Sequence, residues 1–125
     1  MRNEEIVAAA RGCVGARFRP KGRDVRFGLD CVGVAAVAFG RPAPVGYAMR
    51  GGSAAELAGI IDASGLKRVS DGEPGDLALI AGGLGQFHLA VLTGEGFVHA
   101  DARLGRVVET PGLPAPIVGL WREVG

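Results

Sequence analysis

The stretch that decides the fold is Gly28-Leu29-Asp30-Cys31-Val32-Gly33-Val34-Ala35-Ala36-Val37-Ala38-Phe39-Gly40. An uninterrupted run of small apolar residues follows Asp30 and stops at Gly40. This pattern predicts a buried helix over residues 31–39, with Asp30 at its start and Cys31 in its first turn. Unpaired backbone N–H groups and the positive end of the helix dipole gather there. We therefore expect a lowered pKa for the Cys31 thiol and a nucleophilic thiolate.

The bulk composition predicts one globular domain over residues 1–125. The chain is 48% hydrophobic and 22% charged, which is enough apolar material for a proper core. A formal net charge of +1 implies no strong field toward nucleic acid or an anionic membrane. The only cysteines, Cys13 and Cys31, are too few for a disulfide scaffold.

The N-terminal residues predict synthesis in the cytoplasm. Met1-Arg-Asn-Glu-Glu carries acidic residues where an export signal carries basic ones, and no long apolar run follows. We expect no signal peptide and no membrane span. If the protein acts outside the cell, something else carries it there.

Periodicity predicts helices in the first half of the chain and strands in the second. Helices are expected at 3–14, 31–39 and 53–64, with an irregular, arginine-rich loop at 15–29 that forms one wall of the site. Short apolar or alternating segments between glycine-rich turns predict antiparallel strands at 77–80, 87–92, 96–99, 106–109 and 117–122. The expected fold class is α+β, with N-terminal helices packed on a C-terminal antiparallel sheet whose strands follow one another as a meander.

The two histidines complete a possible cysteine–histidine site. His88 lies in the strand at 87–92 and His99 ends the next strand, so the connecting turn can bring both rings to one face. In this interpretation Cys31 attacks a carbonyl, His88 takes and returns the proton, and a neutral His99 orients the ring of His88. The backbone N–H of Cys31 is a natural donor to the oxyanion.

Plainer interpretations compete with this one. A cysteine in an apolar helix is more often a small buried hydrophobe, and Cys13 fits that description well. A lone strand histidine is more often structural than catalytic. Cys31, His88 and His99 could also ligate zinc, although tetrahedral sites usually draw on closely spaced ligand pairs. We expect no metal and no cofactor.

Four motifs in order resemble the NlpC/p60 family of cell-wall cysteine peptidases. Asp30-Cys31-Val32-Gly33 is similar to the Asp-Cys-Ser-Gly signature of their catalytic helix. Pro74-Gly75-Asp76-Leu77 resembles the turn before their first strand. His88-Leu89-Ala90-Val91-Leu92 and Phe97-Val98-His99-Ala100 resemble their two histidine strands. The resemblance implies a papain-like fold and a peptidoglycan hydrolase that cuts an amide or isopeptide bond of the stem peptide through an acyl-enzyme.

The resemblance also implies roles for single residues. Cys31 corresponds to the nucleophile, His88 to the base and His99 to the polar third member. Asp30 corresponds to a residue that in some members binds a free amine of the stem peptide; the alternative is a plain helix cap. Tyr47 is a candidate hydrogen-bond donor near the oxyanion, or else a partly exposed loop tyrosine.

Two sequence features bear on substrate specificity. Val32 replaces the serine that follows the family's cysteine, so a substrate contact made by that serine is lost here. The arginine-rich loop at 17–26, which includes Arg23, either closes the cleft or grips carboxylates of the stem peptide. We expect the second, with Arg23 as a substrate-binding residue.

Other features resemble a subgroup found with tail genes of phages and gene-transfer agents. These are Gly22-Arg23, Tyr47, Gly105 to Glu109 and the closing Trp121-Arg122. The subgroup implies partners in a phage-tail-like or gene-transfer-agent particle and action in the cell wall during delivery. Two alternatives remain open. One is a structural tail or assembly component with a peptidase fold and no turnover. The other is a cysteine amidase or acyltransferase that acts on a different amide.

Overall fold

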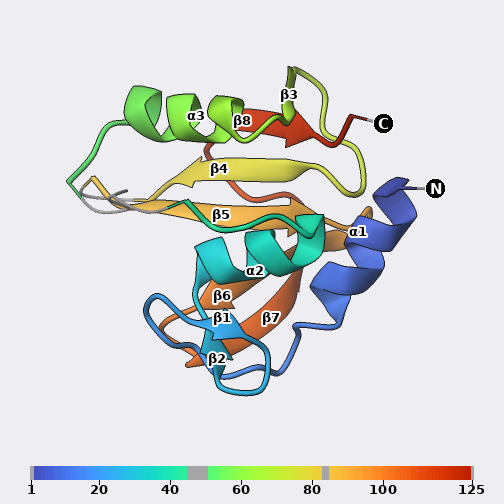
Figure 1. The fold of residues 1–125 in the computed structure, drawn as a ribbon, viewed down its shortest axis with the longest axis vertical. Helices are drawn as coiled ribbons and strands as arrows, with labels where there is room; N and C mark the ends of the chain where they lie inside the picture. The colour runs from blue at the N-terminus through green and yellow to red at the C-terminus, as the bar shows by residue number, and fades with distance from the viewer. Residues whose placement is uncertain (1, 45–50, 83–84, 125) are drawn as a thin grey trace.

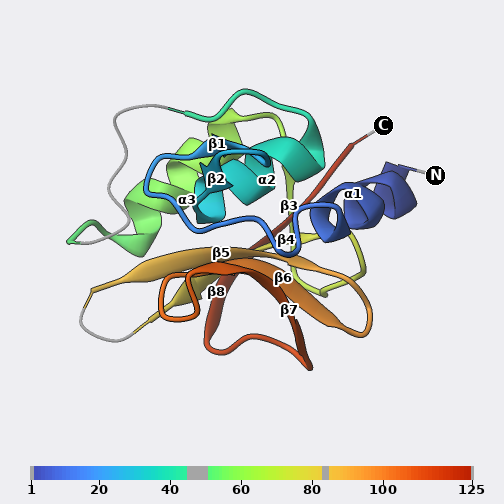
Figure 2. The ribbon, with the colours of Figure 1, turned by 90° about the horizontal axis from the view of Figure 1, so that it is seen from below.

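A computed structural model describes residues 2–44, 51–82 and 85–124 of the chain (Figure 1). The helices are α1 (Arg2–Arg11), α2 (Cys31–Phe39) and α3 (Ala54–Ala63). The strands are β1 (Arg23–Asp24), β2 (Gly28–Leu29), β3 (Lys67–Val69), β4 (Leu77–Ala81), β5 (Phe87–Leu92), β6 (Gly96–Asp101), β7 (Arg106–Pro111) and β8 (Ile117–Arg122). The helices and the small β1–β2 hairpin all lie on one face of the larger sheet, as Figure 2 shows. The α+β class expected from the sequence is confirmed.

Helix α2 begins and ends where the sequence predicts. The Asp30 side chain accepts a hydrogen bond from the Gly33 N–H at 2.8 Å, which satisfies one of the first-turn donors. Gly40 closes the helix in the left-handed conformation, at φ 63°. Helix α3 is capped in the same way by Ser53, whose hydroxyl accepts from the Glu56 N–H at 3.0 Å.

Helix α1 ends three residues before the predicted end at residue 14. From Cys13 onward the hydrogen bonds span three residues instead of four. The Cys13 N–H donates to Ala10 O, and the Val14 N–H donates to Arg11 O. The Gly15 N–H then donates to Val107 O of β7, at 2.9 Å. Pairing with the sheet therefore takes the place of the last helical turn.

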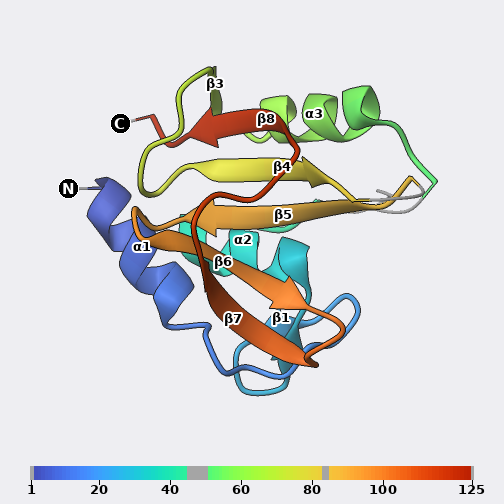
Figure 3. The same ribbon diagram turned by 180° about the vertical axis from the view of Figure 1, so that it is seen from behind.

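The six-stranded sheet has the order β3-β8-β4-β5-β6-β7, and its recorded pairs are antiparallel. Strands β4 to β7 follow one another as predicted. The expectation of a meander is wrong for β8, which lies between β3 and β4. The connection from β7 to β8 crosses the sheet on the face away from the helices (Figure 3). The side chain of Trp121 fixes this position, because it is fully buried and its Nε1–H donates to Asp62 of α3 at 2.8 Å.

The β1–β2 hairpin lies in the loop that the sequence predicted to be irregular. It packs so closely on α2 that a Cβ at Gly33 would lie 2.2 Å from the Gly22 carbonyl oxygen. A glycine two residues after Cys31 is therefore a packing requirement of the hairpin on the helix. Strand β3, also absent from the sequence prediction, pairs Lys67 to Val69 with the end of β8.

Apolar residues fill both faces of the sheet. The larger cluster lies between the sheet and the helices and includes Ile6, Phe39, Leu89, Val91 and Trp121. The smaller cluster lies on the opposite face, and its members are Ala78, Ile80, Ala90, Leu92, Phe97 and Leu120. No helix in the described residues is long and apolar enough to cross a membrane.

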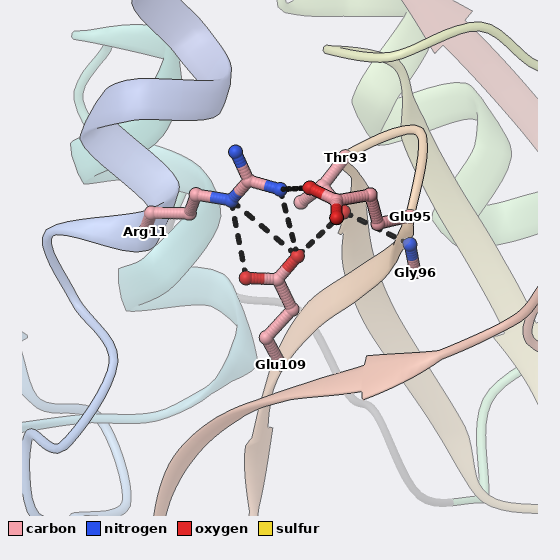
Figure 4. A network of polar contacts seen from close by, with 5 residues as sticks. All are labelled: Arg11, Thr93, Glu95, Gly96 and Glu109. Atoms are coloured by element: carbon pink, nitrogen blue, oxygen red, sulfur yellow. Dashed lines mark hydrogen bonds and ion pairs between the residues drawn. The ribbon is translucent and has the colours of Figure 1, made fainter.

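Arg11 ties the end of α1 to the sheet (Figure 4). Its guanidinium donates to Glu109 of β7 at 3.1 and 3.0 Å, and to Glu95 of the β5–β6 turn at 2.8 Å. The Thr93 hydroxyl donates to the same Glu109 carboxylate at 2.8 Å, and the Gly96 N–H donates to that hydroxyl at 3.0 Å. The pKa of the Glu109 carboxyl is lowered, chiefly by the hydrogen bond from Arg11.

A second ion pair fixes the start of β4 to the end of β8. Asp76 is completely buried and accepts two hydrogen bonds of 2.8 Å from the Arg122 guanidinium. It also accepts from the Glu73 N–H at 2.8 Å, which closes the turn before β4. The Pro74-Gly75-Asp76-Leu77 motif thus contributes a buried bidentate carboxylate to the fold.

Candidate active site

Cys31 and His88 line the same pocket. Its wall is built from the segment before the β1–β2 hairpin, the start of α2, the start of β5 and the end of β6. The lining residues are Phe18, Pro20, Asp30, Cys31, Gln86, Phe87, His88, Ala100 and Ala102. We call this hollow the thiol pocket. Segments far apart in the sequence therefore bring together the expected nucleophile and the expected base.

The Cys31 thiol is buried beneath the pocket surface, with 9% of the residue exposed. Burial raises the pKa of this thiol to about 11, and the negative charge of Asp30 adds to the rise. Hydrogen bonds from backbone N–H groups, that of Leu89 first, act in the opposite direction and are outweighed. The expected lowering of the pKa is therefore wrong, because desolvation exceeds the effect of the helix start. The resting thiol is neutral at pH 7.

Asp30 is fully engaged with the protein. Besides capping α2, it accepts hydrogen bonds of 2.8 Å from the Lys21 N–H and from the Arg23 guanidinium. These contacts hold the start of the hairpin against the start of the helix. The capping role is observed, whereas binding of a substrate amine by Asp30 stays a prediction. Arg23 lies on Asp30, and its expected contact with substrate stays a prediction too.

His88 lies at the rim of the thiol pocket and is exposed. The recorded pairs between β5 and β6 are Val91 with Val98 and Leu92 with Phe97. Closer to His88, the described parts of β5 and β6 are no longer paired with each other, and the thiol pocket lies at this end of the two strands. No hydrogen bond joins the Cys31 thiol to either imidazole among the described residues. The Cys31 thiol and the His88 imidazole therefore share a pocket, and the described residues show no ion pair between them.

His99 lies on β6, on the same face of the sheet as Phe97, is half-buried, and is not among the residues that line the thiol pocket. Its Nε2 is 2.9 Å from the Thr110 hydroxyl oxygen, and its ring lies against Phe97 with centroids 4.9 Å apart. Burial lowers the pKa of His99, the charge of His88 lowers it further, and the charge of Asp101 acts in the opposite direction. A neutral His99 suits the predicted orienting role, because a second positive ring would oppose protonation of His88.

Thr110 is a site residue that the sequence reasoning missed. It pairs with Phe97 across β6 and β7, so its side chain lies on the face of the sheet that His99 shares. Only the register of β6 on β7 identifies this partner, and the chain offered no motif around Thr110.

Two further predicted features have different outcomes. Tyr47 lies outside the described residues. Val32 is buried at 5% exposure in the main core, beside α3 and β4 rather than in the thiol pocket. An apolar residue is therefore well accommodated at the position after Cys31.

The structure gives the zinc alternative no ligand set. Within the described ranges, no three His, Cys, Asp or Glu side chains are grouped so that they could hold a metal ion. The groups that remain are the neutral Cys31 thiol, the exposed His88 imidazole and the half-buried His99 imidazole. Together they can carry out nucleophilic acyl transfer with proton transfer through His88.

Solved structures that resemble the chain include NlpC/p60 domains. The NlpC/p60 domain of the peptidoglycan hydrolase SagA is 23% identical, with a TM-score of 0.60, over 87% of this chain and 88% of that chain. The peptidoglycan hydrolase RipB from Mycobacterium tuberculosis is 22% identical, with a TM-score of 0.64, over 99% of this chain and 65% of that chain. The p60 domain of an antigen from M. avium subspecies paratuberculosis is 18% identical, with a TM-score of 0.60, over 97% and 93%.

These likenesses establish the fold. No family sequence model and no curated protein sequence matches the chain. The helices, the antiparallel sheet and their packing nevertheless have the papain-like arrangement of NlpC/p60 domains. The fold class expected from the sequence motifs is thus confirmed by structure at low sequence identity.

Proposed function

We propose that this protein is a peptidoglycan hydrolase that cleaves an amide or isopeptide bond of the stem peptide. The observation that carries the proposal is the shared pocket of Cys31 and His88 in a papain-like fold. Similar solved structures include domains of the peptidoglycan hydrolases SagA and RipB. Cys31 is the proposed nucleophile, His88 the proposed general base and His99 its orienting partner.

The neutral resting thiol determines how the first step proceeds. As the Cys31 sulfur attacks the carbonyl carbon, His88 takes the thiol proton, so the C–S bond forms while the S–H bond breaks. The backbone N–H of Cys31 at the start of α2 is the proposed donor to the oxyanion. His88 then gives its proton to the leaving amine, the C–N bond breaks, and a thioester remains on Cys31.

Water completes the cycle. His88 removes a proton from the attacking water as its oxygen forms a C–O bond to the acyl carbon, the C–S bond breaks, and the thiolate of Cys31 regains a proton from His88. His99 contacts the Thr110 hydroxyl, and its lowered pKa favours the neutral ring. No second positive charge then opposes protonation of His88. His88 thus returns each proton that it takes, and none of these steps requires a metal or a cofactor.

The proposed setting is a phage-tail-like or gene-transfer-agent particle that opens the cell wall during delivery. Its support is the sequence resemblance around Gly22-Arg23, Gly105 to Glu109 and Trp121-Arg122. Trp121 and Arg122 fix β8 in the sheet, so these two residues also have a structural reason to be present. Detection of this chain in purified tail particles by mass spectrometry tests the assignment, and its absence from them contradicts it.

One observation favours a second candidate, a structural component without turnover. The pKa of the Cys31 thiol is raised to about 11, and the described residues show no hydrogen bond between this thiol and His88. Such a component would tolerate loss of the thiol.

Digestion of purified peptidoglycan separates the two candidates. The native protein is expected to release fragments with one new amine and one new carboxylate within the stem peptide, as read by mass spectrometry. Cys31→Ala is expected to release none, and Cys13→Ala, which alters the other buried thiol, to retain activity. Equal release by native protein and Cys31→Ala would contradict the proposal. No release by the native protein would favour the structural component.

A further inference from the structure

Arginines of this chain fall into two groups. One group lies within 4.0 Å of a carboxylate, and its members in the described residues are Arg2, Arg11, Arg23, Arg26, Arg41, Arg68 and Arg122. Arg103 has no such partner among the described residues, and neither do the three arginines that form this surface, Arg17, Arg19 and Arg106. All three are exposed, and all three line one depression together with Arg26. We call this hollow the arginine depression.

The backbone holds two of these arginines face to face. Arg17 and Arg106 are opposite residues of an antiparallel bridge, and hydrogen bonds of 2.9 Å from Gly15 to Val107 and from Phe18 to Gly105 flank them. Like charges directly opposite each other destabilise a sheet, and a structural role would favour an acid on one side. An anion between the two guanidinium groups would convert the repulsion into attraction.

The surroundings offer these arginines little compensating charge. Asp101 lies opposite Arg106 across β6 and β7, but its carboxylate accepts from the backbone N–H groups of Arg103 and Leu104. The other lining residues are Gly15, Ala16, Val25, Phe27 and Gly105, and the lining contains no acidic residue. Asp24, which lies next to the depression, is already engaged by Arg26 at 3.0 Å. The local excess of arginine contrasts with a net charge of only +1 for the whole chain.

We propose that the arginine depression binds a chain carrying two or more oxyanion groups, phosphate or carboxylate. The planar guanidinium presents paired N–H donors that match the two oxygens of such groups. Several arginines in one hollow favour a ligand with several charges over a single ion.

The position of the depression links it to the thiol pocket. Phe18 lies between Arg17 and Arg19 and is half-buried against the main core. Phe18 lines the thiol pocket, whereas its two neighbours line the arginine depression. One short segment thus separates the two hollows. Under the proposed function, on which this last step rests, the ligand is an anionic stretch of the cell-wall polymer beside the bond to be cut.

Binding is tested on the full chain carrying Cys31→Ala, so that hydrolysis cannot interfere. Tripolyphosphate and tricarballylate are titrated separately, and arginine Nε–H signals are followed by NMR. We expect saturable shifts for Arg17, Arg19 and Arg106 with at least one probe. Replacing both Arg17 and Arg106 with glutamine should weaken binding by about tenfold or more, because two charge-assisted contacts are lost.

The matched control also removes two positive charges, but at the opposite edge of the sheet. Lys67→Gln with Arg68→Gln alters exposed residues on β3, whereas Arg106 lies on β7 at the opposite edge. This control should change affinity by less than about twofold, since distant exposed charges are screened.

Three results would overturn the inference. They are no saturable binding of either probe, an equal loss of affinity in the β3 control, and much tighter binding of a single-stranded oligonucleotide of matched charge. The last would indicate a nucleic-acid surface, for which the exposed Phe27 beneath Arg26 would be a stacking platform. Because binding is measured without turnover, its failure is distinguishable from failure of the proposed hydrolase.

Discussion

The two ends of strands β4 to β6 are built in opposite ways. At one end, which we call the paired end, Asp76 is locked by Arg122 and Glu109 by Arg11. At the other, which we call the open end, the described residues show no hydrogen bond between Cys31 and His88, which share a pocket, and no ion pair of a carboxylate with Arg17 or Arg106, which face each other. At the paired end, these charged side chains form ion pairs that stabilise the fold. The open end also holds engaged groups, Asp30 with Arg23 and Asp24 with Arg26. It nevertheless leaves several reactive or charged side chains without such pairs among the described residues, so chemistry and binding are expected there.

Loss of His88 is expected to have the largest effect and to be confined to activity. His88→Ala should lower the rate of the proposed peptidoglycan cleavage by about 10²–10⁴-fold, because the proposed general base for the Cys31 thiol is removed. The midpoint of denaturant unfolding should stay close to that of the native protein, since the side chain is exposed. Cleavage within a few-fold of the native rate would remove His88 from the mechanism.

The neutral thiol predicts a steep pH dependence of alkylation. The thiolate is the reactive form, so the rate of Cys31 alkylation should rise about tenfold for each pH unit between pH 7 and 10. The rise should level off near the pKa of about 11. Mass spectrometry of the Cys31 peptide gives this rate, with the Cys13 peptide as internal reference. A profile that levels off below pH 7 and changes in His88→Ala would instead demonstrate a preformed thiolate–imidazolium pair.

The paired end should respond in stability. Asp76→Ala leaves the Arg122 guanidinium without its buried partner and should lower the free energy of unfolding by about 3 kcal/mol. Asp71→Ala removes a carboxylate that lies 3.9 Å from the same guanidinium with its side chain 78% exposed. That change should cost about 0.5 kcal/mol or less. Denaturant unfolding measures both values, and equal losses would show that burial of Asp76 adds nothing.

A smaller effect is expected at the packing contact beneath the open end. Gly33→Ala forces a methyl group toward the Gly22 carbonyl oxygen and should lower the free energy of unfolding by about 1–3 kcal/mol. Gly59 on α3 has open space around it, so Gly59→Ala should raise stability by about 0.5–1 kcal/mol. Opposite signs for the two changes support the close approach of the hairpin to α2. If both substitutions lowered the free energy of unfolding, the loss at Gly33 could not be assigned to its close approach to Gly22.

Local sequence patterns predicted helices α2 and α3 and the presence of strands β4 to β7, whereas α1 ends at Arg11, before its predicted end. The run after Asp30 and the Ser53 capping box are local signals, and local hydrogen bonds determine where these helices begin. The placement of β8 was not predictable in this way, because it depends on contacts from Trp121 to Asp62 and from Arg122 to Asp76. Those contacts join residues 59 and 46 positions apart.

The candidate site was predictable in its residue types and not in its electrostatics. Cys31 and His88 were identified from motif and spacing, and the structure places both in one pocket. The pKa of the thiol depends on how deeply the fold buries it, a quantity that no local pattern encodes. Thr110 was missed for a related reason, since the β6–β7 register places it opposite Phe97, where its hydroxyl reaches the His99 ring on the same face.

The central claim is that Cys31 of the open end becomes acylated during turnover. The direct measurement is intact-protein and peptide mass spectrometry after mixing the protein with a purified stem-peptide substrate and quenching in acid. An acyl adduct is expected on the Cys31 peptide in native protein and in Cys13→Ala, and none in Cys31→Ala. Cleavage of the substrate by Cys31→Ala, with no adduct in any variant, would contradict the central claim.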